Sequence, residues 1–148
     1  MTPKTARSIQ VFEPQAKNRV RRPLYTTHVP AGFPSTTDEH FDQKLDLNEH
    51  LIKHPAATFF VRVSGDSMIE AGIHDGDLLV VDRSIEPKDR QIVVAVVDGE
   101  FTVKRLAIKN GRLQLIAANP DYQPISITDA SDFQVWGTVT HVIHTTHR

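Results

Sequence analysis

The chain has 148 residues, of which 39% are hydrophobic, which suits one domain with a modest core and excludes a fully disordered protein. Its 17 basic and 18 acidic residues give a net charge of -1, so no overall field calls for nucleic acid or a membrane as a partner. The sequence contains no cysteine, which excludes disulfides and thiolate metal sites.

Residues 1–40 are predicted to form an extended, poorly ordered N-terminal arm. They contain five of the nine prolines and show no helical period, so they lack the pattern of an independent core. Six basic side chains against Glu13 alone give residues 1–22 a charge of +5. Such a cluster can contact phosphates, but it has no interleaved aromatic residues and no room for a helix-turn-helix domain. We therefore expect no direct sequence-specific DNA binding.

Residues 41–148 are predicted to form one domain that is mainly β, built from several hairpins with one or two short helices. Asp46 and Glu49 have the spacing of a helix N-terminus, and Pro55 ends that helix. Asp98-Gly99 and Asn110-Gly111 supply the positive φ angles of type I′ hairpin turns. Six segments of strand length are rich in Val, Ile, Leu and Phe, namely residues 59–64, 78–82, 91–97, 100–108, 112–117 and 133–144.

Ser67 and Lys104 are the candidate catalytic pair. Ser67 lies in a polar turn after a strand, and Lys104 lies on the return strand of a predicted hairpin. A serine hydroxyl needs a base, and a lysine amine can be that base only if its pKa falls from about 10.4 toward neutrality. That shift of roughly three units corresponds to about 4 kcal/mol, which burial against apolar neighbours can supply. Strand alternation would place Thr102 and Leu106 on the same face as Lys104. The ordinary alternative is that Ser67 is only a turn residue and that Lys104 is a solvated lysine on a strand.

Several histidines and one acidic turn are candidate metal ligands. His50 and His54 share a helix face, but Leu51 stands where a zinc hydrolase has glutamate and no third ligand is evident. The turn at residues 75–77 lacks the later acidic ligands of a calcium loop. Residues three apart on a strand face opposite sides, which separates His141, His144 and His147. We predict no metal site and no cofactor.

Three separate segments, in matching order, resemble a known family: residues 63–68, 72–82 and 97–106. They are similar to the self-cleaving serine peptidase domain shared by LexA, phage repressors and UmuD, over about residues 23–143. The separation of 37 residues between Ser67 and Lys104 also suits that family. Within it, the short arm and the runs at 32–35 and 45–48 resemble UmuD-like members more than LexA.

The resemblance implies that the chain cuts its own arm between a small residue and a glycine. The matching bond is Ala31-Gly32, 36 residues before Ser67. Ser67 would be the nucleophile and Lys104 the general base, with the backbone N–H groups of Asp66 and Ser67 as the oxyanion hole. UmuD commonly has cysteine where this chain has Ala31, but both side chains are small, and a narrow cleft admits them together with glycine.

The resemblance also implies partners. It suggests a homodimer, activation by RecA filaments on single-stranded DNA, and a shortened form that joins a UmuC-like Y-family polymerase as its accessory subunit. This would place the chain in the SOS response, in error-prone translesion synthesis. Two alternatives stay open: a LexA-like or phage-type repressor lacking a recognisable DNA-binding domain, and a purely structural polymerase subunit for which cleavage is irrelevant.

Membrane attachment is not predicted. The longest apolar run has six residues, Ile92 to Val97, against the roughly 20 that a membrane-spanning helix needs. The N-terminus also lacks an apolar signal core. Signal peptidases resemble the same fold, but they carry a membrane anchor that this sequence does not show. We expect a cytoplasmic protein.

Overall fold

The computed structural model describes residues 10–14, 19–24, 28–34 and 43–147, which are mainly β as predicted. The chain divides into two compact units, one of Met1–Pro14 with His54–Arg148 and one of Gln15–Lys53. The boundary that the sequence suggested at residue 40 stays a prediction. Within the described residues, no helix is long and apolar enough to cross a membrane.

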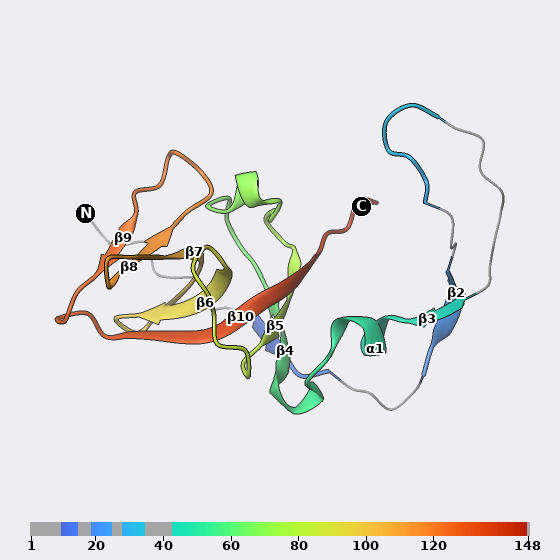
Figure 1. The fold of residues 1–148 in the computed structure, drawn as a ribbon, viewed down its shortest axis with the longest axis horizontal. Helices are drawn as coiled ribbons and strands as arrows, with labels where there is room; N and C mark the ends of the chain where they lie inside the picture. Colours follow the sequence, from blue (N-terminus) through green and yellow to red (C-terminus); the bar gives the residue numbers. More distant parts are fainter. Residues whose placement is uncertain (1–9, 15–18, 25–27, 35–42, 148) are drawn as a thin grey trace. The chain divides into compact units, whose positions relative to one another are not determined.

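The first unit is a single antiparallel sheet of eight strands (Figure 1). Its strands are β1 (Gln10–Phe12), β4 (Thr58–Arg62), β5 (Leu78–Asp82), β6 (Ile92–Val97), β7 (Glu100–Lys109), β8 (Arg112–Ile116), β9 (Ile125–Ile127) and β10 (Phe133–Ile143). In space they follow the order β1-β4-β5-β10-β6-β7-β8-β9. Short 3-10 turns at Pro55–Ala57 and Ile69–Ala71 flank β4 and the segment after it.

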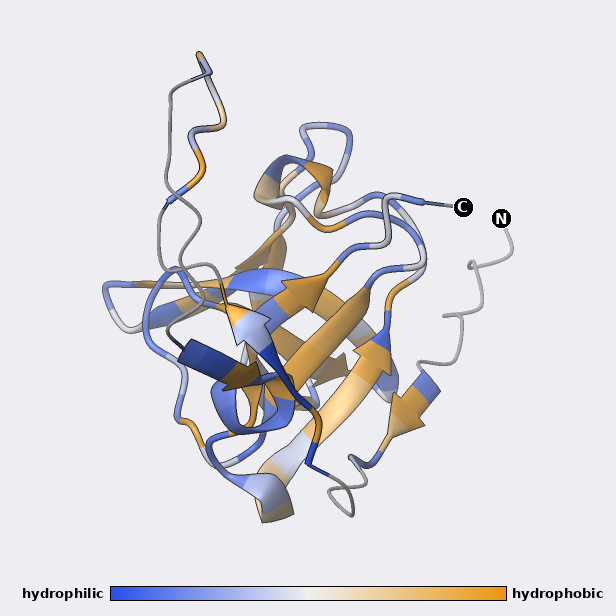
Figure 2. Ribbon diagram, turned by 90° about the vertical axis from the view of Figure 1, so that its right-hand side faces the viewer, coloured by the Kyte–Doolittle hydropathy of each residue, from blue (hydrophilic) through white to orange (hydrophobic). Residues whose placement is uncertain are grey.

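Strand β10 joins the two halves of this sheet. Its first half pairs with β6 and its second half with β5, with a register shift in each half (Figure 1). Apolar side chains cover both faces, because Val94 belongs to one buried cluster while Val93 and Ala95, its neighbours on β6, belong to another. The central strands are accordingly apolar and the connecting turns polar (Figure 2). The central strands of the sheet are therefore buried on both faces.

The second unit contains a two-stranded antiparallel ribbon of β2 (Arg21–Leu24) and β3 (Gln43–Asp46), followed by α1 (Leu47–Leu51). Asp46 caps this helix as predicted, since its side chain accepts a hydrogen bond from the Asn48 N–H at 2.9 Å. The helix ends at Leu51, before the predicted stop at Pro55.

The six predicted strands are confirmed to within two residues at each end. Both predicted hairpin turns are also confirmed, with φ of +49° at Asp98 and +52° at Asn110, each followed by a glycine with positive φ. Four short strands were not predicted: β1, β2, β3 and β9. Two of them, β1 and β2, fall within the range assigned to the arm.

Gly137 on β10 packs closely against side chains of β5 and the residue that follows it. A Cβ atom there would lie 2.5 Å from Cγ1 of Val81, a fully buried core side chain, and 3.3 Å from Cγ of Arg83. Because a packed core yields little, Gly137→Ala should lower the free energy of unfolding by about 1–3 kcal/mol. Chemical denaturation checks this, with Gly111→Ala as a comparison in which strain at a φ of +73° acts without any steric contact. An unchanged midpoint for Gly137→Ala would contradict the close packing.

Candidate active site

The turn that carries Ser67 is anchored on both sides. Gly65 has a φ of +93°, and its backbone N–H donates to Oδ1 of Asp75 at 2.7 Å. No atom lies within 4 Å of where its Cβ would be, so conformation and not space favours glycine here. On the other side Met68 is buried in the core. Ser67 is held half-buried between these two anchors.

The peptide between Asp66 and Ser67 has a fixed orientation. The Asp66 carbonyl accepts hydrogen bonds from the Ile69 N–H at 3.2 Å and from Nδ2 of Asn119 at 3.0 Å. Since a trans peptide directs its N–H opposite to its C=O, the Ser67 N–H points away from these donors. Across the described residues, the N–H groups of Asp66 and Ser67 donate to no protein acceptor. They are therefore available to a developing oxyanion.

The side chain of Asp66 is held as well. Its Oδ1 accepts a hydrogen bond from the Tyr122 hydroxyl at 2.6 Å. This bond to a carboxylate raises the pKa of Tyr122, so the phenol keeps its proton near neutral pH. The loop between β8 and β9 thus clamps the serine turn through Asn119 and Tyr122.

Lys104 lies on β7 and is only 8% exposed. Its Nζ lies 3.1 Å from Oγ of Ser67, 2.7 Å from Oγ1 of Thr102 and 3.1 Å from the Val103 carbonyl oxygen. Burial lowers the pKa of Lys104 because the charged form loses its water. Within the part of the chain that is described, no carboxylate forms an ion pair with this amine.

These contacts fit both protonation states of the amine. A neutral amine has two N–H donors and one lone pair, whereas the charged form has three donors and no acceptor. The three acceptors can take all three donors of the charged form. In the neutral form the Thr102 hydroxyl and the Val103 carbonyl take the two donors, and the lone pair is left for the Ser67 hydroxyl. The arrangement can therefore withdraw a proton from Ser67.

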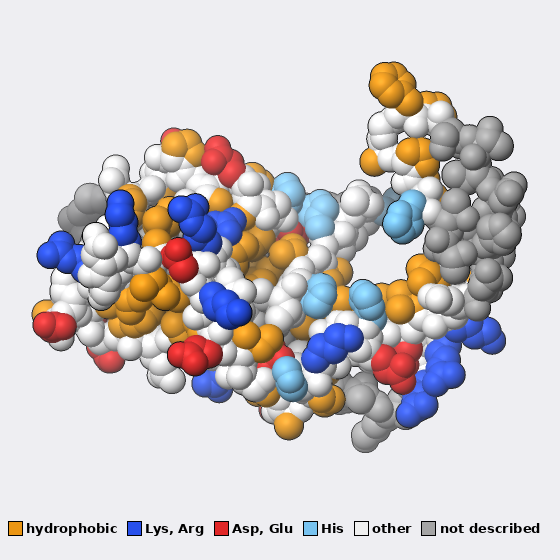
Figure 3. Space-filling model, in the orientation of Figure 1, with side chains coloured by type: hydrophobic (Ala, Val, Ile, Leu, Met, Phe, Trp, Pro, Cys, Tyr) orange, Lys and Arg blue, Asp and Glu red, His pale blue; other side chains and the backbone are white. Residues whose placement is uncertain are grey.

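Ser67 and Lys104 open into a cleft of about 960 Å³. Val97, Phe101 and Ile125 are among the residues that line it, together with four acidic ones, Asp66, Asp75, Asp98 and Glu100. The face of the first unit seen in Figure 3 carries apolar side chains together with charged side chains of both signs. A cleft of this size can hold several residues of a peptide.

The predicted scissile residues, Ala31 and Gly32, are both exposed and lie in a bend of the second unit. Phe33, which follows them, is 92% exposed. The backbone of this segment is therefore open to an attacking group.

The sequence pattern predicted Thr102 on the same strand face as Lys104 but indicated no role for it. It missed Asn119 and Tyr122, because the chain between β8 and β9 carries no periodic pattern that links it to residue 66. His54, one of the candidate metal ligands, pairs with Oδ2 of Asp82 at 2.5 Å. The predicted turn at residues 75–77 is confirmed, with a φ of +86° at Gly76.

Comparison with known proteins identifies the family. Residues 23–140 match the Peptidase S24-like family. The chain is 49% identical over 124 residues to protein SamA of Salmonella typhimurium, covering 84% of this chain and 86% of SamA. It is 44% identical over 135 residues to protein ImpA of Escherichia coli, covering 90% and 91%. With the LexA repressor of Ectopseudomonas mendocina it shares 38% identity over 146 residues, 97% of this chain and 71% of the repressor. The chain therefore belongs to the Peptidase S24-like family and is a UmuD-like member of the LexA/UmuD self-cleaving serine peptidases.

Proposed function

We propose that Ser67 and Lys104 form a catalytic dyad that cuts the chain's own Ala31-Gly32 bond. The observation that carries this proposal is the 3.1 Å approach of the buried Lys104 Nζ to the Ser67 Oγ. The lowered pKa of Lys104 supports it further, since a general base must be neutral near the working pH. The cleft at the dyad gives a peptide segment room to bind.

The reaction proceeds through an acyl-enzyme. Oγ of Ser67 attacks the carbonyl carbon of Ala31 while Lys104 accepts the hydroxyl proton. The N–H groups of Asp66 and Ser67 bind the resulting oxyanion. The C–N bond then breaks, and Lys104 gives its proton to the departing amine of Gly32. Water, deprotonated by Lys104, hydrolyses the ester to leave a carboxylate on Ala31 and restore Ser67.

The proposed cleavage is a single regulatory event and not a general proteolytic activity. Because substrate and enzyme are one chain, control lies in how often residues around Ala31 occupy the cleft. We propose that RecA filaments on single-stranded DNA favour the occupied state and that the protein acts as a homodimer in the SOS response. The shortened form then serves as the accessory subunit of a UmuC-like polymerase in translesion synthesis. Similarity to SamA and ImpA, and the UmuD-like character of the chain, support this role.

The masses of the fragments test where the chain is cut. The full-length protein, incubated with RecA filaments or at alkaline pH, should yield two products that meet between Ala31 and Gly32. Gly32→Val should block the cut, because a branched side chain crowds a site built for glycine. Ser35→Ala, outside the bond, should be cut normally. Fragments that meet at any other bond would overturn the assignment.

The clamp on the serine turn gives a graded prediction. Asn119→Ala removes one of two donors to the Asp66 carbonyl, at a cost of about 1–1.5 kcal/mol, so self-cleavage should slow about tenfold. Gln114→Ala is the matched control, because it also removes a side-chain hydrogen bond, from Nε2 to Oγ of Ser126, but this bond is exposed and does not involve the serine turn. Cleavage rates measured on folded proteins check this. Equal rates for Asn119→Ala and wild type would show that the clamp has no part in positioning Ser67.

A further inference from the structure

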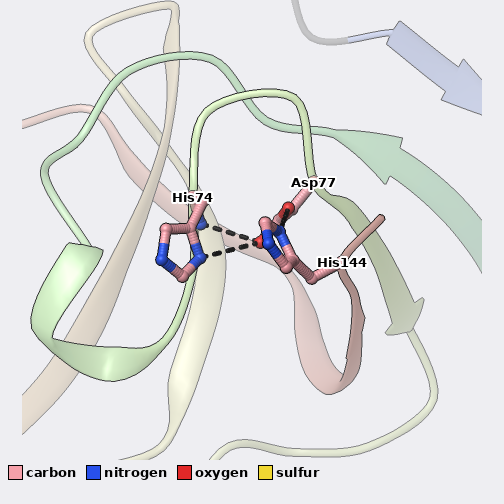
Figure 4. A group of neighbouring side chains, drawn as sticks. All are labelled: His74, Asp77 and His144. Atoms are coloured by element: carbon pink, nitrogen blue, oxygen red, sulfur yellow. Dashed lines mark hydrogen bonds and ion pairs between the residues drawn. The ribbon is translucent and has the colours of Figure 1, made fainter. Parts of the chain in front are cut away.

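Three side chains outside the proposed active site converge at the start of β5: His74, Asp77 and His144 (Figure 4). His74 and Asp77 flank the turn before β5, and His144 follows directly on β10. Antiparallel pairing of Leu78 with Ile143 brings the two segments together. One nitrogen from each imidazole and one carboxylate oxygen lie within 4.8 Å of one another.

Asp77 is the fixed centre of this group. It is 2% exposed, and its Oδ2 accepts a hydrogen bond from the His74 backbone N–H at 2.8 Å. Its Oδ1 lies 2.6 Å from Nδ1 of His144. Burial alone would raise the pKa of Asp77, but the hydrogen bonds and nearby imidazoles outweigh it and lower the pKa. The carboxylate is therefore ionised at neutral pH.

His74 leaves one nitrogen unsatisfied. Its Nδ1 lies 3.6 Å from Oδ2 of Asp77, which is too long for a hydrogen bond. That nitrogen is buried, and among the described residues it has no hydrogen-bond partner. The His74 and His144 rings lie 4.5 Å apart at 35°.

We propose that His74, Asp77 and His144 form a binding site for a divalent transition-metal ion of the Zn²⁺ type. Two imidazoles and one carboxylate are a ligand set that zinc takes in proteins, with a fourth position left for water. A cation here would satisfy the orphaned nitrogen and neutralise the buried carboxylate together.

The geometry permits such a site with small movements. Metal–ligand bonds of about 2.0–2.2 Å put tetrahedral ligand atoms about 3.3 Å apart, so the widest pair must close by about 1.5 Å. The His74 and His144 side chains are 45% and 36% exposed, so their rings can rotate toward Asp77. The same exposure gives an ion and its water a path to the site.

The site is joined to the serine turn. The Val63 N–H donates to the Asp77 carbonyl at 2.9 Å, and the Gly76 N–H donates to the Val63 carbonyl at 2.8 Å. Asp75, between His74 and Gly76, accepts from the Gly65 N–H. A cation held by His74 and Asp77 would brace the loop that supports Gly65, two residues before Ser67.

Zinc binding by the untagged full-length chain tests the proposal. Titration with Zn²⁺ in competition with a metal indicator should show one saturable site. His74→Gln and His144→Gln should each weaken it at least tenfold. His54→Gln is the matched control, because it also removes a histidine paired with an aspartate, Asp82, but leaves the three-residue group intact. Its zinc affinity should equal that of wild type.

Two further readouts separate a built site from loose binding to surface histidines. Zn²⁺ should raise the melting temperature of wild type and His54→Gln but not of His74→Gln or His144→Gln, because only a folded-state site stabilises the fold. With Co²⁺, the wild-type protein should show the intense visible absorption of a four-coordinate site, and His74→Gln and His144→Gln should not. The absence of saturable binding, or equal loss of affinity in all three histidine variants, would overturn the proposal.

Discussion

Ser67→Ala and Lys104→Met are each expected to abolish self-cleavage, with rates at least about 10³-fold below wild type. Ser67→Ala removes the attacking oxygen. Lys104→Met keeps the volume of the buried side chain but removes the nitrogen that lies 3.1 Å from Oγ. Because two members of one catalytic unit act together, the double variant should be no slower than either single one. The self-cleavage rates of the two single variants and the double variant are measured by quantifying the full-length band over time with RecA filaments present.

The chain offers matched controls for both substitutions. Ser64→Ala removes another hydroxyl from the same turn, and Lys109→Met removes an exposed lysine from the same strand. Within the described residues, neither side chain takes part in the hydrogen bonds that join Ser67 and Lys104, so both variants should cut at the wild-type rate. Lys104→Met should also fold well, since it relieves the burial of an amine. Cleavage by Ser67→Ala, or loss of cleavage in either control, would contradict the dyad.

The second large effect is the pH dependence of uninduced self-cleavage. The base must be neutral, and its neutral fraction rises tenfold per pH unit below the pKa of Lys104. Since burial lowers that pKa from the ordinary value, the rate should climb with pH and level off before the ordinary lysine pKa of about 10.4. A lysine in water would still be gaining neutral fraction at that point.

Rates measured in the absence of RecA from about pH 6 upward give this profile. Thr102→Val supplies a second check, because it removes the hydroxyl 2.7 Å from Nζ without touching Ser67. That loss leaves the amine less well hydrogen-bonded, so the rate at every pH should fall while the upward slope remains. A flat profile in the wild-type protein would show that deprotonation of Lys104 does not limit the reaction.

The sequence predicted the strands that bury apolar residues, and it failed where strands are short. The runs Leu78–Asp82 and Ile92–Val97 are long and apolar enough to be recognised alone, and the glycines at 99 and 111 mark the turns. Strands β1, β2, β3 and β9 have three or four residues each. They exist because a partner strand pairs with them, which is a long-range effect that no local pattern reports.

The same distinction holds at the site. The local sequence pattern predicted Ser67 in a turn and Lys104 on a hairpin strand, and strand alternation predicted Thr102 on the same face as Lys104. It did not find Asn119, which reaches the turn through a loop that follows β8. Nor did it join His74 to His144, because the pairing of β5 with β10 that brings them together spans most of the domain.

Activation of Ser67 by Lys104, directed at the chain's own Ala31-Gly32 bond, is the proposed function of the site. It is tested most directly by the mass spectrum of full-length Lys104→Met incubated beside wild type at pH 9–10. Wild type should give two fragments that meet between Ala31 and Gly32, while Lys104→Met should keep the mass of the intact chain. Fragments of the same masses from Lys104→Met, formed at the wild-type rate, would contradict the claim.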